Sequence, residues 1–307
     1  MAKRILITGS NGLLGQKLVA LLRTQPEIEV VASSRGANKL ATLYPDVRFV
    51  PLDVTDAAQV TQVLSDVNPS HLIHTAAMTN VDECELNRAA CWQQNVTAVE
   101  NLVAVCEVLA VHLIHVSTDF VFSGNAGPLA EDALPAPVNY YGESKMAAEQ
   151  VVQVATCPWS IVRTVLVYGV AHDYGRTNIV LWVRDSLRAH TPIKVVDDQL
   201  RTPTLAEDLA QGCWLVAQQN ATGIFHISGD ELLTPYDMAL RVADFFGLDK
   251  QLITKVNSDT FTQPARRPPR TGFIISKARR ILGYQPHSFE EGMRLLAQQL
   301  GEIQQTG

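Results

Sequence analysis

Short apolar runs alternate along this 307-residue chain with longer stretches in which apolar residues recur every three or four positions. The runs predict buried strands, and the stretches predict amphipathic helices. The expected strands are Arg4–Thr8, Glu29–Ser34, Val47–Leu52, His71–Thr75, His112–Ser117, Ser160–Val167, Ile193–Val196 and Gly223–Ile227. The expected helices are Asp56–Asp66, Arg88–Leu109, Gly142–Ala155, Ala206–Gln219 and Phe289–Leu300. This alternation predicts an α/β fold with a doubly wound parallel sheet, whose ligands bind at the carboxyl ends of the strands.

The alternation loosens near Val167, and the chain from Thr234 onward is mostly helical with the proline-rich segment QPARRPPRTG inside it. We therefore expect two unequal parts. Residues 1–168 form the first domain, with later returns to its sheet near 193–230, and residues 169–307 form mostly a smaller, mainly helical lobe.

Three glycines spaced three residues apart follow the first expected strand, in the segment RILITGSNGLLGQKLVALL. Glycine permits a turn with positive φ and lets the backbone approach a ligand or another element closely. The helix that follows directs its free N–H groups and its positive dipole end at the turn, which suits a pyrophosphate. A plain tight turn is the alternative. The strand–glycine–helix context favours a Rossmann-type dinucleotide site around Gly9, Gly12 and Gly15.

The second strand ends in VVASSRGANK, where a fold that prefers NAD commonly places an acidic residue for the ribose 2′-hydroxyl. This chain has Ser33, Ser34, Arg35 and Lys39 there instead. Arginine pairs with a 2′-phosphate, which a carboxylate would repel, so the segment favours NADP; an exposed loop arginine is the alternative. After the third strand, Asp53 either meets the adenine amine or caps the next helix.

The segment NYYGESKMAAEQ carries the candidate chemistry, because Tyr141 and Lys145 stand four residues apart and share a face if the segment is helical. A neighbouring ammonium favours the ionised phenol, so we expect Lys145 to lower the pKa of Tyr141 and make it a usable proton donor and acceptor. A chance pair on a surface helix is the alternative. Upstream, HLIHVSTDFVFSG places Ser117, Thr118 and Asp119 at the end of a strand, where a hydroxyl can hold a substrate carbonyl.

Composition excludes several classes of protein. With 47% hydrophobic residues the chain can bury a large core, and its formal charge of −6 argues against a nucleic-acid surface. No apolar run is long enough to suggest a signal segment or a membrane span. The five cysteines form no CxxC pair, which favours free thiols in a reducing cytoplasm.

The motifs TGSNGLLG, HTAAMTNVDECE, NVTAVENL, VSTDFVFSG, YYGESK and IVRTVLVYG, in this order and spacing, resemble those of the extended short-chain dehydrogenase/reductases, and most of all the dTDP-4-dehydrorhamnose reductase family. The resemblance covers nearly the whole chain. It implies an NADPH-dependent reductase of a nucleotide-linked 4-keto sugar, as in rhamnose biosynthesis. In such an enzyme Thr118, Tyr141 and Lys145 would be the catalytic triad, with Tyr141 giving a proton to the developing alkoxide.

The residues and the resemblance together predict two binding sets. The cofactor would contact Gly9, Asn11, Gly12, Leu13, Leu14, Gly15, Ser34, Arg35, Asp53, Val54, Ala76, Ala77, Asn95, Tyr141 and Lys145, with Asn95 supporting the active-site strand through a structural hydrogen bond. The substrate would contact Thr79, Asp119, Tyr140, Arg201 and Arg267. Arg201 is the first choice for a phosphate contact and Arg267 the second.

Alternatives stay open at this point. Asp119 is followed by Phe120 rather than by a second acid, which disfavours dehydration, and an exchangeable NADP disfavours an epimerase. A non-catalytic regulatory subunit similar to the beta subunit of methionine adenosyltransferase is the other class. The two HLIH segments are interpreted as structural, since residues three apart on a strand face opposite sides, and no metal is expected. NAD as the cofactor and a homodimer are left open.

Overall fold

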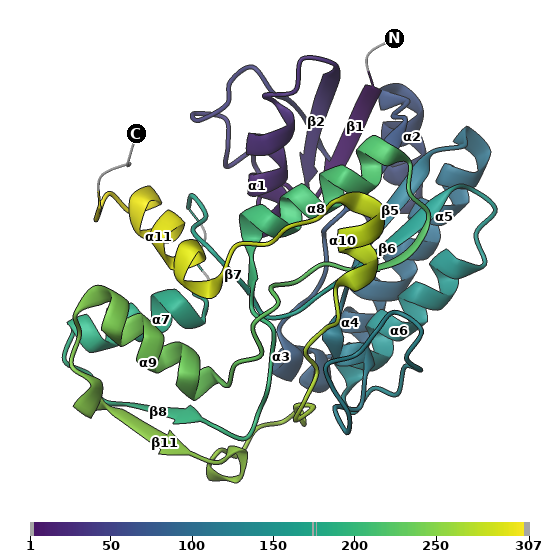
Figure 1. Cartoon of the computed structure of the whole chain (residues 1–307). Coiled ribbons are helices and arrows are strands. Elements are labelled where there is room, and N and C mark those ends of the chain that lie inside the picture. The colour runs from purple at the N-terminus through teal and green to yellow at the C-terminus, as the bar shows by residue number, and fades with distance from the viewer. Residues whose placement is uncertain (1–2, 174, 176, 304–307) are drawn as a thin grey trace.

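The computed structural model describes residues 3–173, 175 and 177–303 and centres on a seven-stranded sheet (Figure 1). Its strands are β1 (Lys3–Thr8), β2 (Ile28–Ser34), β3 (Arg48–Pro51), β4 (His71–His74), β5 (His112–Thr118), β6 (Trp159–Thr164) and β10 (Gly223–His226). They lie in the order β10-β6-β5-β4-β1-β2-β3, and every pairing is parallel. Because the strand order reverses between β1 and β4, the two halves of the sheet meet there. The predicted Rossmann-type doubly wound fold is confirmed.

Helices cover both faces of the sheet, which is why its strands are apolar throughout. In β1, Ile5 and Ile7 join the core on one face and Leu6 joins the core on the other. The first core lies under α1 (Leu13–Leu22), α8 (Ala206–Gln219) and α10 (Ser276–Leu282), and the second under α2 (Ala57–Val67), α5 (Ala98–Leu109) and α6 (Tyr140–Gln153). Among the residues that the structure describes, no helix is long and apolar enough to cross a membrane.

A smaller lobe with its own apolar core lies below the sheet in Figure 1. It contains α7 (Ile179–Arg188), α9 (Pro235–Phe246), α11 (Phe289–Gln299), β8 (Ile193–Val196) and β11 (Ile253–Val256), with short 3-10 turns η3 (Lys250–Leu252) and η4 (Ser258–Thr260). The small pair β7 (Val167–Tyr168) and β9 (Thr204–Leu205) lies where the chain passes between the two parts. The expected C-terminal helix is therefore present, and it packs into the lobe's core through Phe289, Met293 and Leu296.

The expectation that Ile193–Val196 returns to the main sheet is wrong. This strand, β8, pairs in parallel with β11 in a separate two-stranded sheet of the small lobe, and only β10 returns to the main sheet. Its burial alternates, with Ile193 and Val195 buried and Lys194 exposed. One apolar face suits a small sheet covered by α9 on one side, whereas an inner strand of the main sheet is buried on both faces.

Two expected elements are interrupted. The helix expected over Arg88–Leu109 consists of α4 (Arg88–Trp92), a π-helical turn η1 (Gln93–Thr97) and α5, and it is preceded by the short helix α3 (Val81–Leu86). The strand expected over Ser160–Val167 stops at Thr164, because Leu166 has a φ of 38°, in the left-handed region that breaks a strand. Both interruptions lie beside the pocket described next.

Candidate active site

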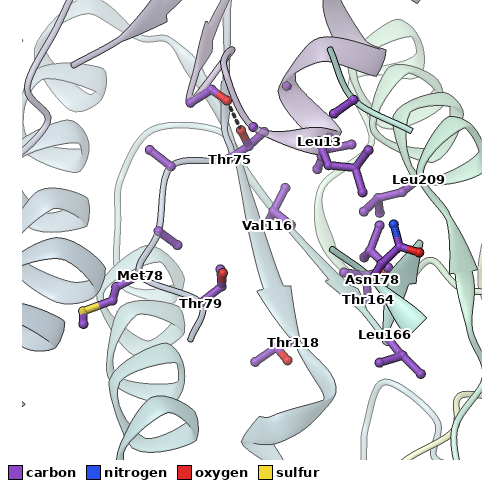
Figure 2. A pocket seen from close by; sticks show the side chains of 18 of the residues that line it. Leu13, Thr75, Met78, Thr79, Val116, Thr118, Thr164, Leu166, Asn178 and Leu209 are labelled. Atoms are coloured by element: carbon purple, nitrogen blue, oxygen red, sulfur yellow. Dashed lines mark hydrogen bonds between the residues drawn. The ribbon is translucent and has the colours of Figure 1, made fainter. Parts of the chain in front are cut away.

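A cavity of about 1290 Å³ opens at the carboxyl ends of β1, β4 and β5, beside the point where the strand order reverses. Figure 2 shows side chains from both parts of the chain around it: Val116 and Thr118 from β5, Thr75, Met78 and Thr79 after β4, and Leu13, Asn178 and Leu209 opposite them. A cavity at this position of an open parallel sheet is where such folds bind their ligands.

The glycine turn forms one wall of the cavity. Gly9 has a φ of 74°, and a Cβ atom there would lie 2.7 Å from the backbone nitrogen of Ala76. A Cβ atom on Gly15 would lie 2.3 Å from the carbonyl oxygen of Gly9, so that helix α1 can pack on the turn only with glycine. Gly12 stands at the N-cap of α1 without a side-chain cap, which leaves the N–H groups of the first turn available to an anion. The turn therefore fits a pyrophosphate.

The loop after β2 closes the far end of this wall. The side chain of Asn11 organises it, donating to Ser34 Oγ at 2.7 Å and to the carbonyl oxygen of Ala37 at 2.8 Å, and accepting from the backbone N–H of Lys39 at 3.0 Å. Arg35 is exposed and lines the cavity, in a position to meet a phosphate.

Asp53 also lines the cavity, and the alternative that it caps a helix is wrong. The N-cap of α2 is Asp56, whose Oδ1 accepts from the N–H groups of Ala58 and Gln59. Burial raises the pKa of Asp53, but hydrogen bonds from Thr55 and the charge of Arg35 outweigh it and hold the pKa below its ordinary value. Asp53 is therefore an ionised acceptor at the cavity wall.

Tyr141 and Lys145 are brought to the cavity by helix α6, which begins against the end of β5. Asn139 caps the helix by accepting from the N–H of Gly142 at 2.8 Å. A Cβ atom on Gly142 would lie only 2.1 Å from the carbonyl oxygen of Phe120, in the 3-10 turn η2 (Asp119–Val121) that follows Thr118. The helix therefore lies directly on the turn, which places Tyr141, Lys145 and Thr118 around one space.

The side chains of these residues are buried, and burial dominates their protonation. It raises the pKa of Tyr141 above its ordinary value, although the hydroxyl of Thr118 acts in the opposite direction as a hydrogen-bond partner. Burial lowers the pKa of Lys145 to about 8. Because burial outweighs the other influences on the phenol, the expected lowering of the Tyr141 pKa is wrong for this structure. The ammonium of Lys145 bonds to β5, where Nζ donates to the carbonyl oxygen of Val116 at 2.8 Å.

Asp119 and Arg201 form a buried pair behind Thr118. Oδ1 of Asp119 accepts from the Thr118 hydroxyl at 3.1 Å, Oδ2 accepts from the Thr271 hydroxyl, and Nε of Arg201 lies 3.8 Å from Oδ2. The other donors of Arg201 bond to the carbonyl oxygens of Leu200, Pro268 and Pro269 and to the side chain of Gln199. Arg201 lines the cavity. Its contacts nevertheless indicate that it holds the loop that contains Pro268 and Pro269, rather than binding a phosphate directly.

Arg267 lines the cavity as well and is paired with Asp82 through both terminal guanidinium nitrogens, at 2.6 and 2.7 Å. Its NH1 also donates to the carbonyl oxygen of Ala265. Asp82 lies in the first turn of α3 and Arg267 in the loop between η4 and α10, so this ion pair joins that loop to the main domain beside the cavity.

Two predicted binding residues do not line the cavity. Asn95, in the π-helical turn, is buried and bonds to the backbone of Met78 through both side-chain atoms, at 2.8 and 3.0 Å, and to Ser144 Oγ at 3.0 Å. These bonds hold the segment after β4 and helix α6, rather than the active-site strand that the prediction named, and Asn95 does not line the cavity. Tyr140 turns away toward Trp92 and Arg88, whose guanidinium lies 4.8 Å from its ring centre. The other predicted cofactor and substrate residues all line the cavity.

Sequence reasoning missed the side of the cavity formed after β6. Thr164, Leu166, Asn178, Gln199 and Leu209 line it, and none of them was assigned to a binding site from the sequence alone, although Thr164 and Leu166 lie within the motif IVRTVLVYG. Asn178 had a signal, because an asparagine before an apolar periodic run is a helix cap, and it does cap α7 by accepting from the N–H of Leu181 at 3.3 Å.

The two HLIH segments lie side by side in β4 and β5, where His71 pairs with His112 and His74 with His115. Their ring centres are 5.3 and 5.5 Å apart. Over residues 3–173, 175 and 177–303, no group of three or more histidine, cysteine, aspartate or glutamate side chains is placed to hold a metal ion.

Comparison with known proteins agrees with this geometry. The family model described as RmlD substrate binding domain matches residues 3–301. A dTDP-4-keto-6-deoxy-D-glucose reductase of Streptomyces niveus is 35% identical, over 88% of this chain and 88% of its own length. The methionine adenosyltransferase 2 subunit beta of Mus musculus is 27% identical, over 95% of this chain and 86% of its own length.

The crystal structure of dTDP-4-dehydrorhamnose reductase from Bacillus anthracis, in complex with NADP, superposes with a TM-score of 0.82 at 29% identity and covers 96% of this chain and 99% of its own. The sequence resemblance to the extended short-chain dehydrogenase/reductases is thus confirmed. Since the family model spans all but the two ends of the chain, this protein belongs to the RmlD substrate binding domain family.

Proposed function

We propose that this protein is an NADPH-dependent reductase of a nucleotide-linked 4-keto sugar. The observation that carries the proposal is the convergence of Thr118, Tyr141 and Lys145 on a cavity that also contains the glycine turn. The dTDP-sugar reductase among its relatives and the NADP complex of a structural neighbour support the substrate class and the cofactor.

The residues present fit NADP. The uncapped start of α1 and the close approach that Gly9 and Gly15 permit would hold the pyrophosphate, and Arg35 would meet the 2′-phosphate. When bound, NADPH supplies the hydride. Ala76, Ala77 and Val54 add small apolar surface on which a dinucleotide can lie.

The raised pKa of Tyr141 keeps its phenol protonated near neutrality, which suits a proton donor to the oxygen of a carbonyl being reduced. The Thr118 hydroxyl would donate to the same oxygen and fix the carbonyl against the phenol. Lys145, whose pKa burial lowers to about 8, is mostly an ammonium at neutral pH and would hold the ribose beside the nicotinamide.

The rival activities fit less well. Asp119 follows Thr118 but is tied to Thr271 and Arg201, and the next residue is Phe120, whose ring lies edge-on against Tyr141 at 5.9 Å. No second acid stands there for water elimination, which argues against a dehydratase. A purely regulatory role, as the methionine adenosyltransferase relative raises, does not account for a buried tyrosine, lysine and threonine that all face one cavity.

The nucleotide end of the substrate would lie toward the small lobe. A second cavity of about 310 Å³ is lined by Trp182, Phe261 and Lys194, and it shares Arg267 and Gln199 with the main cavity. Aromatic rings beside an arginine and a lysine suit a base and a pyrophosphate. Arg267 therefore replaces Arg201 as the first choice for a phosphate contact.

The test is turnover of dTDP-4-keto-6-deoxy-D-glucose, followed by the loss of NADPH absorbance. Tyr141→Phe should lower kcat by about 10²-fold or more with little change in the Kd of NADPH, because the phenol acts mainly in the transition state. Tyr140→Phe is the matched control, since Tyr140 lies next in the chain but outside the cavity. A Tyr141→Phe enzyme within a few-fold of the native rate contradicts the proposal.

A cytoplasmic location and a homodimer are further parts of the proposal. The five cysteines are all free and buried, which suits a reducing compartment. Cell fractionation and light scattering on the purified chain decide these two points.

A further inference from the structure

The paired HLIH segments divide into two histidine pairs with different surroundings. His71 and His112 stand at the amino ends of β4 and β5, where His71 bonds to Ser70 and Asn220, and His112 Nε2 lies 2.8 Å from Ser160 Oγ. Neither lines the cavity, and neither do His74 and His115. These contacts are what a purely structural pair makes.

The second pair lies farther along the strands, where His74 ends β4 and His115 stands in the middle of β5, next to Val116 of the cavity wall. His74 Nδ1 lies 2.7 Å from Thr8 Oγ1, and His115 Nε2 lies 3.1 Å from Nζ of Lys145. Both rings are buried, and His115 has no exposed surface. The second pair therefore connects the sheet to a side chain of the proposed active site, which the first pair does not.

The proton on His115 follows from its partner. An ammonium has three donors and no acceptor, so Nε2 of His115 must accept from Lys145, and the ring proton is on Nδ1. Nδ1 is buried and has no hydrogen-bond partner among the described residues. Leaving this N–H without a partner is unfavourable. Among the described residues, the contact of Nε2 with Lys145 is the polar interaction that the His115 ring makes.

We propose that His115 is a positioning residue that accepts a hydrogen bond from Lys145 and thereby directs the lysine ammonium at the cofactor and Tyr141. The carbonyl oxygen of Val116, the next residue of β5, accepts a second bond from the same ammonium. Two of the three N–H donors of the Lys145 ammonium are therefore bound to β5, so the ammonium cannot rotate freely. The direction of its third N–H is fixed as a result. This inference rests on the proposed function.

The surroundings keep His115 neutral, as an acceptor must be. Burial, then the charges of Lys145 and His74, lower its pKa well below the ordinary value. The other titratable groups that act on Lys145 are Glu149, on the same helix, and Cys91, on α4. Two groups of this cluster change charge across the pH range of an assay: Lys145, whose pKa burial lowers to about 8, and Cys91, whose pKa hydrogen bonding with Cys84 lowers to about 7.

The experiment replaces the acceptor and compares the two histidine pairs. His115→Leu removes the acceptor, His115→Gln offers an amide oxygen near the position of Nε2, and His112→Leu removes a buried histidine of the same strand outside the site. For each variant we would measure kcat with dTDP-4-keto-6-deoxy-D-glucose, its pH profile, the Kd of NADPH by calorimetry, and the melting temperature. His115→Met serves if the leucine variant does not fold.

We expect His115→Leu to lower kcat by about tenfold or more, and to weaken NADPH several-fold, because a misdirected ammonium no longer fits the ribose. The basic limb of the kcat–pH profile of this variant should move to lower pH, because the loss of the acceptor disfavours the charged form of Lys145 and so lowers its pKa. His115→Gln should recover most of both losses, and His112→Leu should show neither. Equal losses in His112→Leu, failure of His115→Gln to recover, or a His115→Leu enzyme with unchanged kcat and NADPH affinity would each overturn the inference.

Failure of the proposed function gives a different result. If Tyr141→Phe and Lys145→Ala leave turnover unchanged, the proposed chemistry is wrong whatever His115 does. If Lys145→Ala weakens NADPH and His115→Leu does not, the cofactor site stands and only the positioning role fails.

Discussion

Gly142→Ala should impair catalysis without touching any reacting group. The new Cβ atom would lie 2.1 Å from the carbonyl oxygen of Phe120 and 2.9 Å from Cβ of Pro137. Since Cβ contacts under 3.0 Å essentially never occur, helix α6 must move from turn η2 by about 0.9 Å at the least. The neighbouring oxygen belongs to the backbone of Phe120, two residues after Thr118, so the movement separates Tyr141 and Lys145 from Thr118.

The magnitude follows from two opposing terms. Alanine favours a helix over glycine by about 1 kcal/mol, whereas forcing extra atoms into a packed site costs about 1–3 kcal/mol. The steric term wins, and the free energy of unfolding should fall by about 0–2 kcal/mol. A misplacement of about 1 Å costs a catalytic site on the order of 10²-fold, so kcat should fall far more than stability does.

The assay is kcat for NADPH oxidation with the keto sugar, alongside urea unfolding. Glu143→Ala is the matched control, because Glu143 is the next residue of α6 and is exposed. It changes the helix in the same turn without a new contact to η2. A Gly142→Ala enzyme that keeps kcat within threefold of the native value would refute the argument that α6 must lie directly on the turn.

Two further predictions concern charge. Arg35→Ala should weaken the binding of NADPH by about tenfold or more and leave the binding of NADH nearly unchanged, because only NADPH offers a 2′-phosphate to the guanidinium. The control is Arg48→Ala, which changes an exposed arginine outside the cavity. Equal losses of affinity for both cofactors would remove the basis for NADP preference. The free energy of unfolding should fall as the pH drops below 6.5, by up to about 1.4 kcal/mol per pH unit for each of the buried residues His74 and His226. The reason is that burial lowers the pKa of each histidine to about 3 in the folded protein, whereas the unfolded chain binds a proton at about 6.5. Above pH 6.5 both states are neutral and this contribution is fully present, so the urea midpoint should be flat from pH 7 to 8 and fall toward pH 5; a midpoint that rises on acidification would contradict the assignment.

The sequence alone was sufficient for the parts of this protein that depend on neighbours within a few residues. Gly9 and Gly15 act through a strand, a turn and a helix that are contiguous in the chain, and a spacing of four brings Tyr141 and Lys145 to one face of any helix. The alternation of strands and helices likewise defined the main sheet, because a strand buried on both faces is apolar at every position.

Tertiary contacts decided the rest. Ile193–Val196 is as apolar as a strand of the main sheet, and only its pairing with Ile253–Val256 shows which sheet it joins. The role of Arg201 depends on carbonyl oxygens from Pro268 and Pro269, far along the chain, and no local pattern distinguishes an arginine that holds a loop from one that binds a phosphate.

Protonation was decided in the same way. The spacing of Tyr141 and Lys145 predicts a lowered phenol pKa, but the pKa is raised, because burial depends on everything that packs around the ring. The two HLIH segments are identical as sequences, yet one places His115 against Lys145 and the other places His74 against Thr8. Spacing along the chain determines which residues share an element, whereas dielectric surroundings and hydrogen-bond partners come from residues that are remote in sequence, and only the folded structure brings these together.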